Sequence, residues 1–204
     1  MKTEEKIISK ALEMFNQRGI EYVGLRELAS VLQIRVSNIT YYFPKKDDLV
    51  NRLSMDLNKL NSEVVVENEH LTMLTFLEMF HKVFQNHVKY RCLLLSLVHI
   101  LEQNKVISEK YKNTQRTRNE TMKLTLIHLQ QTGYLNSVSE NKLHFLVSML
   151  SLIARFWISE ATVSFRNLSR DEQIRHYLIL IVELFYPYCT ETGKEEIQRF
   201  LEKI

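Results

Sequence analysis

The chain has 204 residues, of which 45% are hydrophobic and 25% charged, a balance that excludes a disordered chain and leaves room for a sizeable core. Only four Gly and two Pro interrupt it, which favours helices and argues against a turn-rich all-β fold. The formal net charge of +3 is too small to demand an anionic partner, so the distribution of charge has to carry that argument.

The first predicted helices are short. Ile7, Ala11 and Phe15 recur with helical spacing, and the helix that they define ends at Gly19, a residue suited to a helix C-terminus. A second helix is predicted from Leu25 to about Leu32.

A third short helix is predicted to end at Phe43, because Pro44 after it can begin a helix but cannot continue one. The fourth predicted helix is longer. Asp47 and Asp48 lie in its first turn, where carboxylates complement the helix dipole, and apolar residues between positions 49 and 64 form its buried stripe.

Longer helices are predicted beyond residue 69, over 71–88, around 91–102 and from about 106 to 133, and these would form a second core. Two more, around 140–165 and 170–188, are apolar over more than one stripe. Each therefore needs more than one packing partner, and another subunit can supply one of them. We predict a homodimer through these two helices, with a helix pair buried in a monomer as the alternative.

The basic residues gather near the second and third helices. Between positions 26 and 46, Arg26, Arg35, Lys45 and Lys46 are opposed by Glu27 alone, so four minus one gives a local charge of +3. The rest of the chain is nearly neutral, which marks this segment as a candidate for binding an anionic partner.

The same segment has the apolar spacing of a helix-turn-helix. Ala29 is small enough for the two helices to approach closely, and Ile34 and Ile39 would fill the corner between them. The predicted exposed arc of the second helix is Arg35, Ser37, Asn38, Thr40 and Tyr41. Because these side chains can read base edges or bind phosphate oxygens, the pattern favours duplex DNA, although a polar helical hairpin without this function has a similar pattern.

The segment resembles the N-terminal domain of the tetracycline-repressor (TetR) family of transcription regulators. The run KIISKALEMFNQRGIEYVGLRELA is similar to the family's first helix, the glycine after it (Gly19) and the Arg-x-x-Ala of its second helix (Arg26 and Ala29). The run ITYYFPKKDDL is similar to the end of the family's recognition helix. The resemblance covers residues 3 to about 55.

This resemblance implies an all-α fold in which an N-terminal three-helix helix-turn-helix domain, 1–48, is joined by a fourth helix to a C-terminal helical ligand-binding and dimerisation domain, 49–204. It also implies a sequence-specific regulator without a cofactor, a repressor that a small-molecule effector releases from a palindromic operator in double-stranded DNA. The half-sites would lie about one helical turn, roughly 34 Å, apart.

The resemblance also implies which residues contact DNA. Together with Arg35 from the exposed arc, they are Arg26, Val36, Ser37, Asn38, Thr40, Tyr41, Tyr42 and Lys46. Three positions depart from the family pattern, since Gln33 replaces a turn Gly, Arg35 a capping Ser or Thr, and Thr40 an aromatic residue. We expect Gln33 to adopt a backbone conformation that Gly reaches at lower cost, and Ser37 to cap the helix instead of residue 35.

The effector pocket is implied to lie among the fifth to eighth helices. Its candidate walls are Phe76, Phe80, Phe84, Phe156 and Trp157, although aromatic residues at helical spacing also form ordinary cores.

Two other functions fit parts of the sequence. Glu67 with His70 and Glu78 with His81 have the Glu-x-x-His spacing of di-metal helical bundles. On one helix, eleven residues separate the two motifs by about 16 Å, whereas bridged metals lie about 4 Å apart, so we expect neither a metal site nor an enzyme. A helical protein-binding adaptor is the third possibility, and it leaves the basic, tyrosine-containing segment unexplained.

Features of the chain favour the cytoplasm. Cys92 and Cys189 lie among apolar residues, which predicts buried thiols in a reducing compartment. Glu4 and Glu5 near the start of the chain do not fit a signal peptide. The longest apolar run, 92–101, is shorter than the roughly 20 residues that a membrane span needs.

Overall fold

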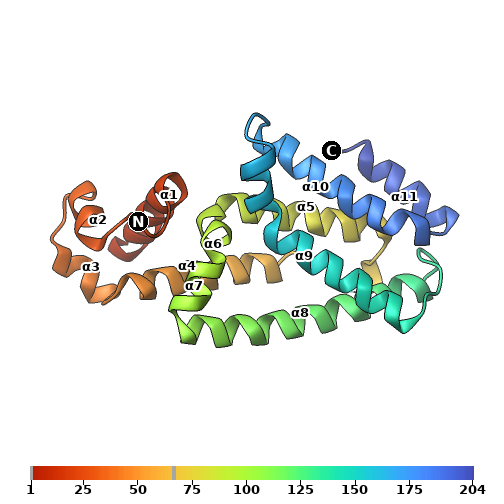
Figure 1. Cartoon of the computed structure of the whole chain (residues 1–204), viewed down its shortest axis with the longest axis horizontal. Helices are drawn as coiled ribbons and strands as arrows, with labels where there is room; N and C mark the ends of the chain where they lie inside the picture. The colour runs from red at the N-terminus through yellow and green to blue at the C-terminus, as the bar shows by residue number, and fades with distance from the viewer. Residues whose placement is uncertain (1, 66–67) are drawn as a thin grey trace. The chain divides into compact units, whose positions relative to one another are not determined.

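The computed structural model describes residues 2–65 and 68–204, and in these residues it is helical without a strand, which confirms the all-α prediction (Figure 1). The first helices are α1 (Thr3–Arg18), α2 (Leu25–Val31), α3 (Val36–Tyr42), α4 (Lys46–Ser62) and the short η1 (Asn68–His70). They are followed by α5 (Met73–Lys89), α6 (Arg91–Leu95), α7 (Leu97–Gln103), α8 (Lys105–Gln131), α9 (Glu140–Ser164), α10 (Arg170–Phe185), η2 (Tyr186–Tyr188) and α11 (Glu191–Leu201).

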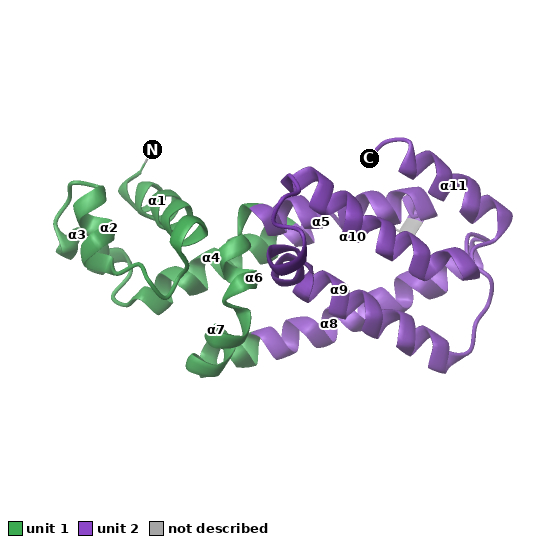
Figure 2. Ribbon diagram, turned by 45° about the horizontal axis from the view of Figure 1, so that its top comes forward, with its two compact units in different colours: residues 1–60, 89–110 green, residues 61–88, 111–204 purple. Residues whose placement is uncertain are grey.

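The chain divides into two compact units, which Figure 2 colours separately. Unit 1 comprises residues 1–60 and 89–110, and unit 2 comprises residues 61–88 and 111–204. The boundary predicted after Asp48 falls inside α4, and α6 and α7 belong to the unit that contains α1 to α3. Unit 1 is therefore larger than the predicted DNA-binding domain.

One asparagine explains why α6 lies against α1. The Oδ1 atom of Asn16 accepts a hydrogen bond from the backbone N–H of Cys92 at 3.0 Å, and its Nδ2 donates to the carbonyl of Lys89 at 2.8 Å. Arg91 also donates to the Asn16 carbonyl at 3.3 Å. Because these partners are more than seventy positions apart in the chain, helical periodicity does not reveal the contact.

Two features of the helices differ from the sequence-based expectations. The helix expected around 91–102 is broken at Ser96, a buried residue whose ψ of 12° separates α6 from α7. The C-terminal helix α11 was not predicted, and its N-cap is Thr190, whose side chain accepts a hydrogen bond from the N–H of Gly193. A Cβ at Gly193 would lie 2.2 Å from the carbonyl oxygen of Tyr134, so only glycine fits there.

The core of unit 2 lies where α5 and α10 pack with α9. Figures 1 and 2 both show α9 beside α10, and the two helices are in contact. Phe76 on α5 meets Phe185 on α10 with ring centres 5.5 Å apart, and Phe84 on α5 stacks on Trp157 of α9 at 4.8 Å. Burying such large aromatic surfaces is the main driving force for assembling this unit.

Candidate nucleic-acid interface

The turn between α2 and α3 has the geometry expected from the sequence. Gln33 has a φ of 55°, and it is the only described non-glycine residue with a positive φ. The N–H of Gln33 donates to the carbonyl of Ser30 at 3.1 Å, and the N–H of Ile34 to that of Ala29 at 3.0 Å. This pair of bonds is the Schellman ending of a helix, and it confirms that Gln33 occupies a position that favours glycine.

The two helices pack closely at small or apolar residues. Ala29 is 2% exposed and Ile39 is fully buried, which matches the predicted corner of a helix-turn-helix. The prediction that Ser37 caps α3 is wrong. Arg35 occupies the N-cap position without a side-chain hydrogen bond, and Ser37 lies one residue inside the helix. A Ser37 hydroxyl that caps nothing remains available to an outside partner.

The polar face of α3 is turned to solvent. Its exposed residues are Arg35, Val36, Ser37, Asn38, Tyr41 and Tyr42. Tyr41 is 80% exposed, and its ring meets that of Tyr42 edge to face with centres 5.0 Å apart. Thr40 is half-buried, and its hydroxyl donates to the carbonyl of Ser37 at 3.4 Å. The large, exposed tyrosines stabilise no core, so they suit contact with a partner.

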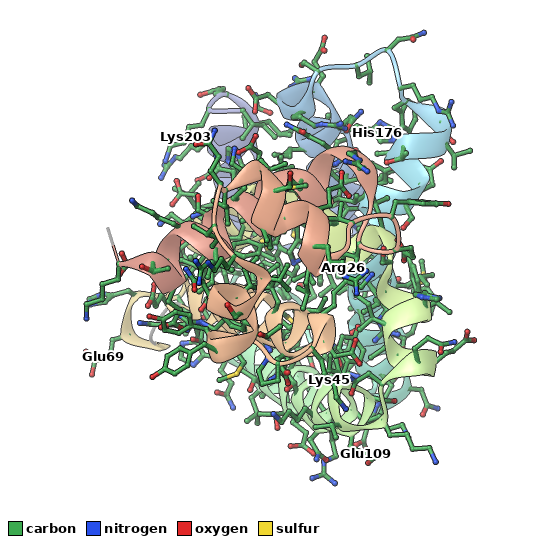
Figure 3. The ribbon with its side chains drawn as sticks, turned by 90° about the vertical axis from the view of Figure 1, so that its left-hand side faces the viewer. Arg26, Lys45, Glu69, Glu109, His176 and Lys203 are labelled. Atoms are coloured by element: carbon green, nitrogen blue, oxygen red, sulfur yellow. The ribbon has the colours of Figure 1, made fainter. Side chains whose placement is uncertain are left out.

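Positive charge on this part of unit 1 is not neutralised. Arg26, Arg35 and Lys45 are exposed and form no ion pair within the described residues, and Figure 3 labels two of these side chains, Arg26 and Lys45. The nearby carboxylate of Glu27 is instead paired with Arg18 of α1. The free cations can therefore contact an anionic backbone such as that of DNA.

Lys46 has a structural partner in addition to any DNA contact. Its Nζ donates to the carbonyl of Ile20 at 2.9 Å and lies 3.4 Å from that of Glu21, so it ties the start of α4 to the loop after α1. An ammonium has three N–H groups, which leaves one for a phosphate. The sequence could not show this additional role.

A small cavity of about 70 Å³ adjoins this lysine within unit 1, lined in part by Glu21, Lys46, His99 and Asn104. Burial raises the pKa of Glu21, but a hydrogen bond with Ser96 and the charges of His99 and Lys46 outweigh it, so the pKa lies below its usual value. The loop after α1 is thus held by both α4 and α7.

The predicted effector-pocket residues are only partly together. Phe76, Phe80, Phe84 and Trp157 are buried in unit 2, where neighbouring rings touch along α5 with centres 5.2 and 6.3 Å apart. Phe156 is half-exposed on another side of α9, so it does not belong to this aromatic group. Sequence reasoning missed the polar residues beside the group, His87 and Arg155 among them, because isolated polar residues on apolar helices carry no spacing signal.

The first of the two Glu-x-x-His pairs includes Glu67, which lies outside the described residues. In residues 2–65 and 68–204, no group of three or more His, Cys, Asp or Glu side chains is placed to hold a metal ion.

Comparisons with known proteins agree with this architecture. A family described as bacterial transcriptional repressor (TetR) matches residues 58–197, and one described as bacterial regulatory proteins, tetR family, matches residues 7–53. The probable HTH-type transcriptional regulator YttP of Bacillus subtilis is 39% identical over 51 residues, which are 25% of each chain. The match thus spans about a quarter of the length of this curated relative.

Solved structures share the fold over most or all of the chain. A TetR-family transcriptional regulator from Marinobacter aquaeolei has a TM-score of 0.90 at 20% identity, covering 100% of this chain and 98% of its own. A putative transcriptional regulator from Saccharomonospora viridis, solved in complex with choline, has a TM-score of 0.63 at 17% identity over 88% of this chain and 95% of its own. With a family match over more than half of its length, the chain belongs to the TetR family of bacterial transcriptional regulators.

Proposed function

We propose that the chain is a repressor whose residues 1–48 bind a palindromic operator in double-stranded DNA. The observation that carries the proposal is the exposed polar face of α3, a short helix held on a close-packed corner and flanked by cations that form no ion pair among the described residues. A recognition helix placed in the major groove needs such a face, and the flanking cations supply phosphate contacts. Residues 49–204 would bind the effector and the partner subunit.

Each predicted contact has a chemical role. Ser37 and Asn38 lie at the start of α3, where their hydroxyl and amide groups can hydrogen-bond to base edges, and the methyl groups of Val36 can contact a thymine methyl. Tyr41, Tyr42, Thr40 and Lys46 would contact phosphates, and Arg26 and Arg35 the backbone or a base. The assignment predicts that α3 determines sequence preference and its neighbours determine overall affinity.

A homodimer would present two recognition helices to the operator. On α9, Phe145, Leu152 and Val163 are 47%, 52% and 74% exposed, and Leu180 on α10 is 41% exposed. Their spacing places the α9 residues on one face, opposite the face buried in unit 2. Helix α9 is also a candidate membrane span by length and composition, and a subunit interface accounts for its two apolar faces in a protein of the cytoplasm.

The proposed effector acts by population shift. It releases DNA only if it binds more tightly to a conformation in which the two recognition helices are wrongly spaced. The choline complex of a protein with this fold supports small-molecule binding as a property worth testing here. TetR-family regulators are DNA-binding proteins, and we propose no catalytic activity for this one.

The test is selection of bound duplexes from a random DNA pool with the full-length protein, followed by titration of the selected duplex at several salt concentrations. We expect a palindromic sequence and a steep loss of affinity with salt. Asn38→Ala is expected to relax preference at one or two positions, and an unchanged selected motif would show that Asn38 reads no base. Failure to enrich any sequence, or binding insensitive to salt, would favour the adaptor alternative.

A further inference from the structure

Two lysines and two aspartates follow one another at the start of α4, over Lys45–Asp48, and they form no ion pairs with one another. Neither lysine forms an ion pair with any other described residue. The carboxylate of Asp48 instead accepts a hydrogen bond from the backbone N–H of Lys45 at 2.8 Å. The carboxylate of Asp47 accepts one from Nδ2 of Asn104 at 2.9 Å. Because both acidic side chains are held by neutral donors, both ammonium groups keep their charge for an outside anion.

Asn104 lies where α7 ends and α8 begins, and both helices fix it. Its backbone N–H donates to the carbonyl of Ile100 at 3.0 Å, and its own carbonyl accepts from the N–H of Ser108 at 2.9 Å. Its Oδ1 accepts from the N–H of Ile107 at 3.0 Å, so the side chain caps the start of α8. Because a backbone N–H can only donate, the amide oxygen must face it, and the amide nitrogen is left to face Asp47.

The residues at both ends of α7 hold carboxylates near Lys46. Before the helix, Ser96 hydrogen-bonds the side chain of Glu21, which lies close enough to interact electrostatically with Lys46. After the helix, Asn104 holds Asp47. The ammonium of Lys46 is left with neutral partners, the carbonyls of the loop after α1. All of these residues belong to unit 1 (Figure 2).

A hydrogen bond rather than close packing fixes the side chain of Asp47. The residue is exposed, and together with Lys46 and Asn104 it lines the cavity of about 70 Å³ in unit 1. This space leaves room for the carboxylate to turn. Without the amide of Asn104, the carboxylate of Asp47 would be drawn toward the neighbouring ammonium groups, since opposite charges at the start of one helix attract each other.

From these contacts we propose that Asn104 is a positioning residue for DNA binding, which holds the carboxylate of Asp47 away from Lys46 and so keeps this lysine available to a phosphate. The inference rests on the proposed function, in which Lys46 contacts the DNA backbone. Asn104 itself contacts no DNA in this role. Its substitution should therefore change the number of phosphate contacts only through Asp47.

The variant Asn104→Asp separates this role from the helix cap. An aspartate keeps an oxygen for the N–H of Ile107, and it replaces the donor that faces Asp47 with a second carboxylate. The two carboxylates repel each other, which drives Asp47 toward the lysines. The double variant Asp47→Asn with Asn104→Asp restores one donor and one acceptor across the same pair, and it has the net charge of the wild type.

The measurement is the salt dependence of binding of the full-length protein to a duplex of random sequence, because phosphate contacts do not depend on base sequence. The slope of log affinity against log salt reports how many phosphates are neutralised. Asn104→Asp is expected to lower this slope by about one and to weaken binding at low salt at least about fivefold. The double variant should restore both values. Loss of folded protein would reduce the bound fraction but not the slope, so the slope separates positioning from stability.

A matched control tests for the effect of the added charge alone. Gln103→Glu places the same charge one residue away on an exposed side chain, and it should weaken binding less than about twofold. Circular dichroism melting shows whether each variant is folded. An unchanged slope in Asn104→Asp, or a loss that the double variant does not restore, would overturn the proposal. A loss of the same size in Gln103→Glu would overturn it too, because charge alone would then account for the effect.

The duplex of random sequence needs no operator, so the two hypotheses can fail separately. A protein that selects a palindrome but keeps its salt slope in Asn104→Asp retains the proposed function and loses this inference. A protein whose slope depends on Asn104 but that selects no sequence retains the positioning role and loses the function of a sequence-specific repressor.

Discussion

The polar surface of α3 and the polar group inside unit 2 use similar side chains under opposite conditions. On α3, Asn38 and Tyr41 are exposed, and in free protein water satisfies them. In unit 2, His87 is buried and bonded to Trp157, whereas Arg155 Nε and the Tyr177 hydroxyl are buried without a hydrogen-bond partner among the described residues. An exposed polar group stays hydrated and costs little free energy of folding, whereas a buried polar group destabilises the fold unless it is hydrogen-bonded within it. Substitutions on α3 should therefore change binding, and substitutions inside unit 2 should change stability as well.

The largest expected difference is in the free energy of unfolding. Trp157→Ala removes a fully packed indole and leaves a cavity, so it should destabilise the protein by about 3 to 5 kcal/mol. Asn38→Ala, on the exposed face, should change stability by no more than about 0.5 kcal/mol. Urea denaturation followed by circular dichroism measures both. A loss of similar size in both variants would contradict the contrast between the two regions.

A pH series sharpens the comparison at His87. Burial lowers the pKa of His87 to about 3 in the folded protein, against 6.5 for an ordinary histidine. Between these two pH values the histidine is therefore protonated in the unfolded chain and neutral in the native protein. The contribution of His87 to stability is complete above pH 6.5 and declines as pH falls, by about 1.4 kcal/mol per pH unit. Comparing wild type with His87→Gln between pH 6.5 and 5 isolates it. Identical slopes for the two proteins would mean that His87 does not remain neutral.

Substitutions of two adjacent lysines should have different effects on the stability of the protein. Lys45→Ala is expected to lower the salt slope of DNA binding by about one, with stability unchanged, because the side chain is exposed. Lys46→Ala is expected to lower the slope by about one too, and also to reduce thermal stability, because its Nζ bonds to the carbonyl of Ile20. Salt titrations and melting curves on the two variants are read together. An unchanged slope for Lys46→Ala would leave that lysine with its structural role only.

The smallest expected effect concerns the turn between α2 and α3. Gln33 has a φ of 55°, so Gln33→Gly should relieve strain and stabilise the protein by up to about 1 kcal/mol, with DNA affinity unchanged. Gln33→Ala retains the Cβ and should give no such gain. Thermal melting distinguishes them, and equal melting temperatures for the glycine and alanine variants would show that backbone strain is not the cause.

The N-terminal helices could be predicted in detail because their signals are local. Helical periodicity predicts these helices, and Gly19 and Pro44 mark two of their ends. The backbone conformation of Gln33 in the turn followed from the glycine usually found there. The cap of α3 could not be predicted, since Ser37 and Arg35 differ by only two positions and the backbone decides which residue begins the helix. The break at Ser96 and the helix α11 were missed for the related reason that long-range contacts stabilise short segments.

The sequence by itself determined the helical class, the order of the first helices and four of the five residues expected on the exposed face of α3, all but the half-buried Thr40, since each depends on neighbours a few positions apart. Only the tertiary structure decided that Asn16 holds α6 against α1, that Lys46 bonds to the loop after α1, and that Trp157 donates a hydrogen bond to His87 inside unit 2. These contacts join residues distant in the chain, and no periodicity records them. Packing of the apolar faces determines how the helices lie against one another, and this arrangement determines which polar side chains come into contact.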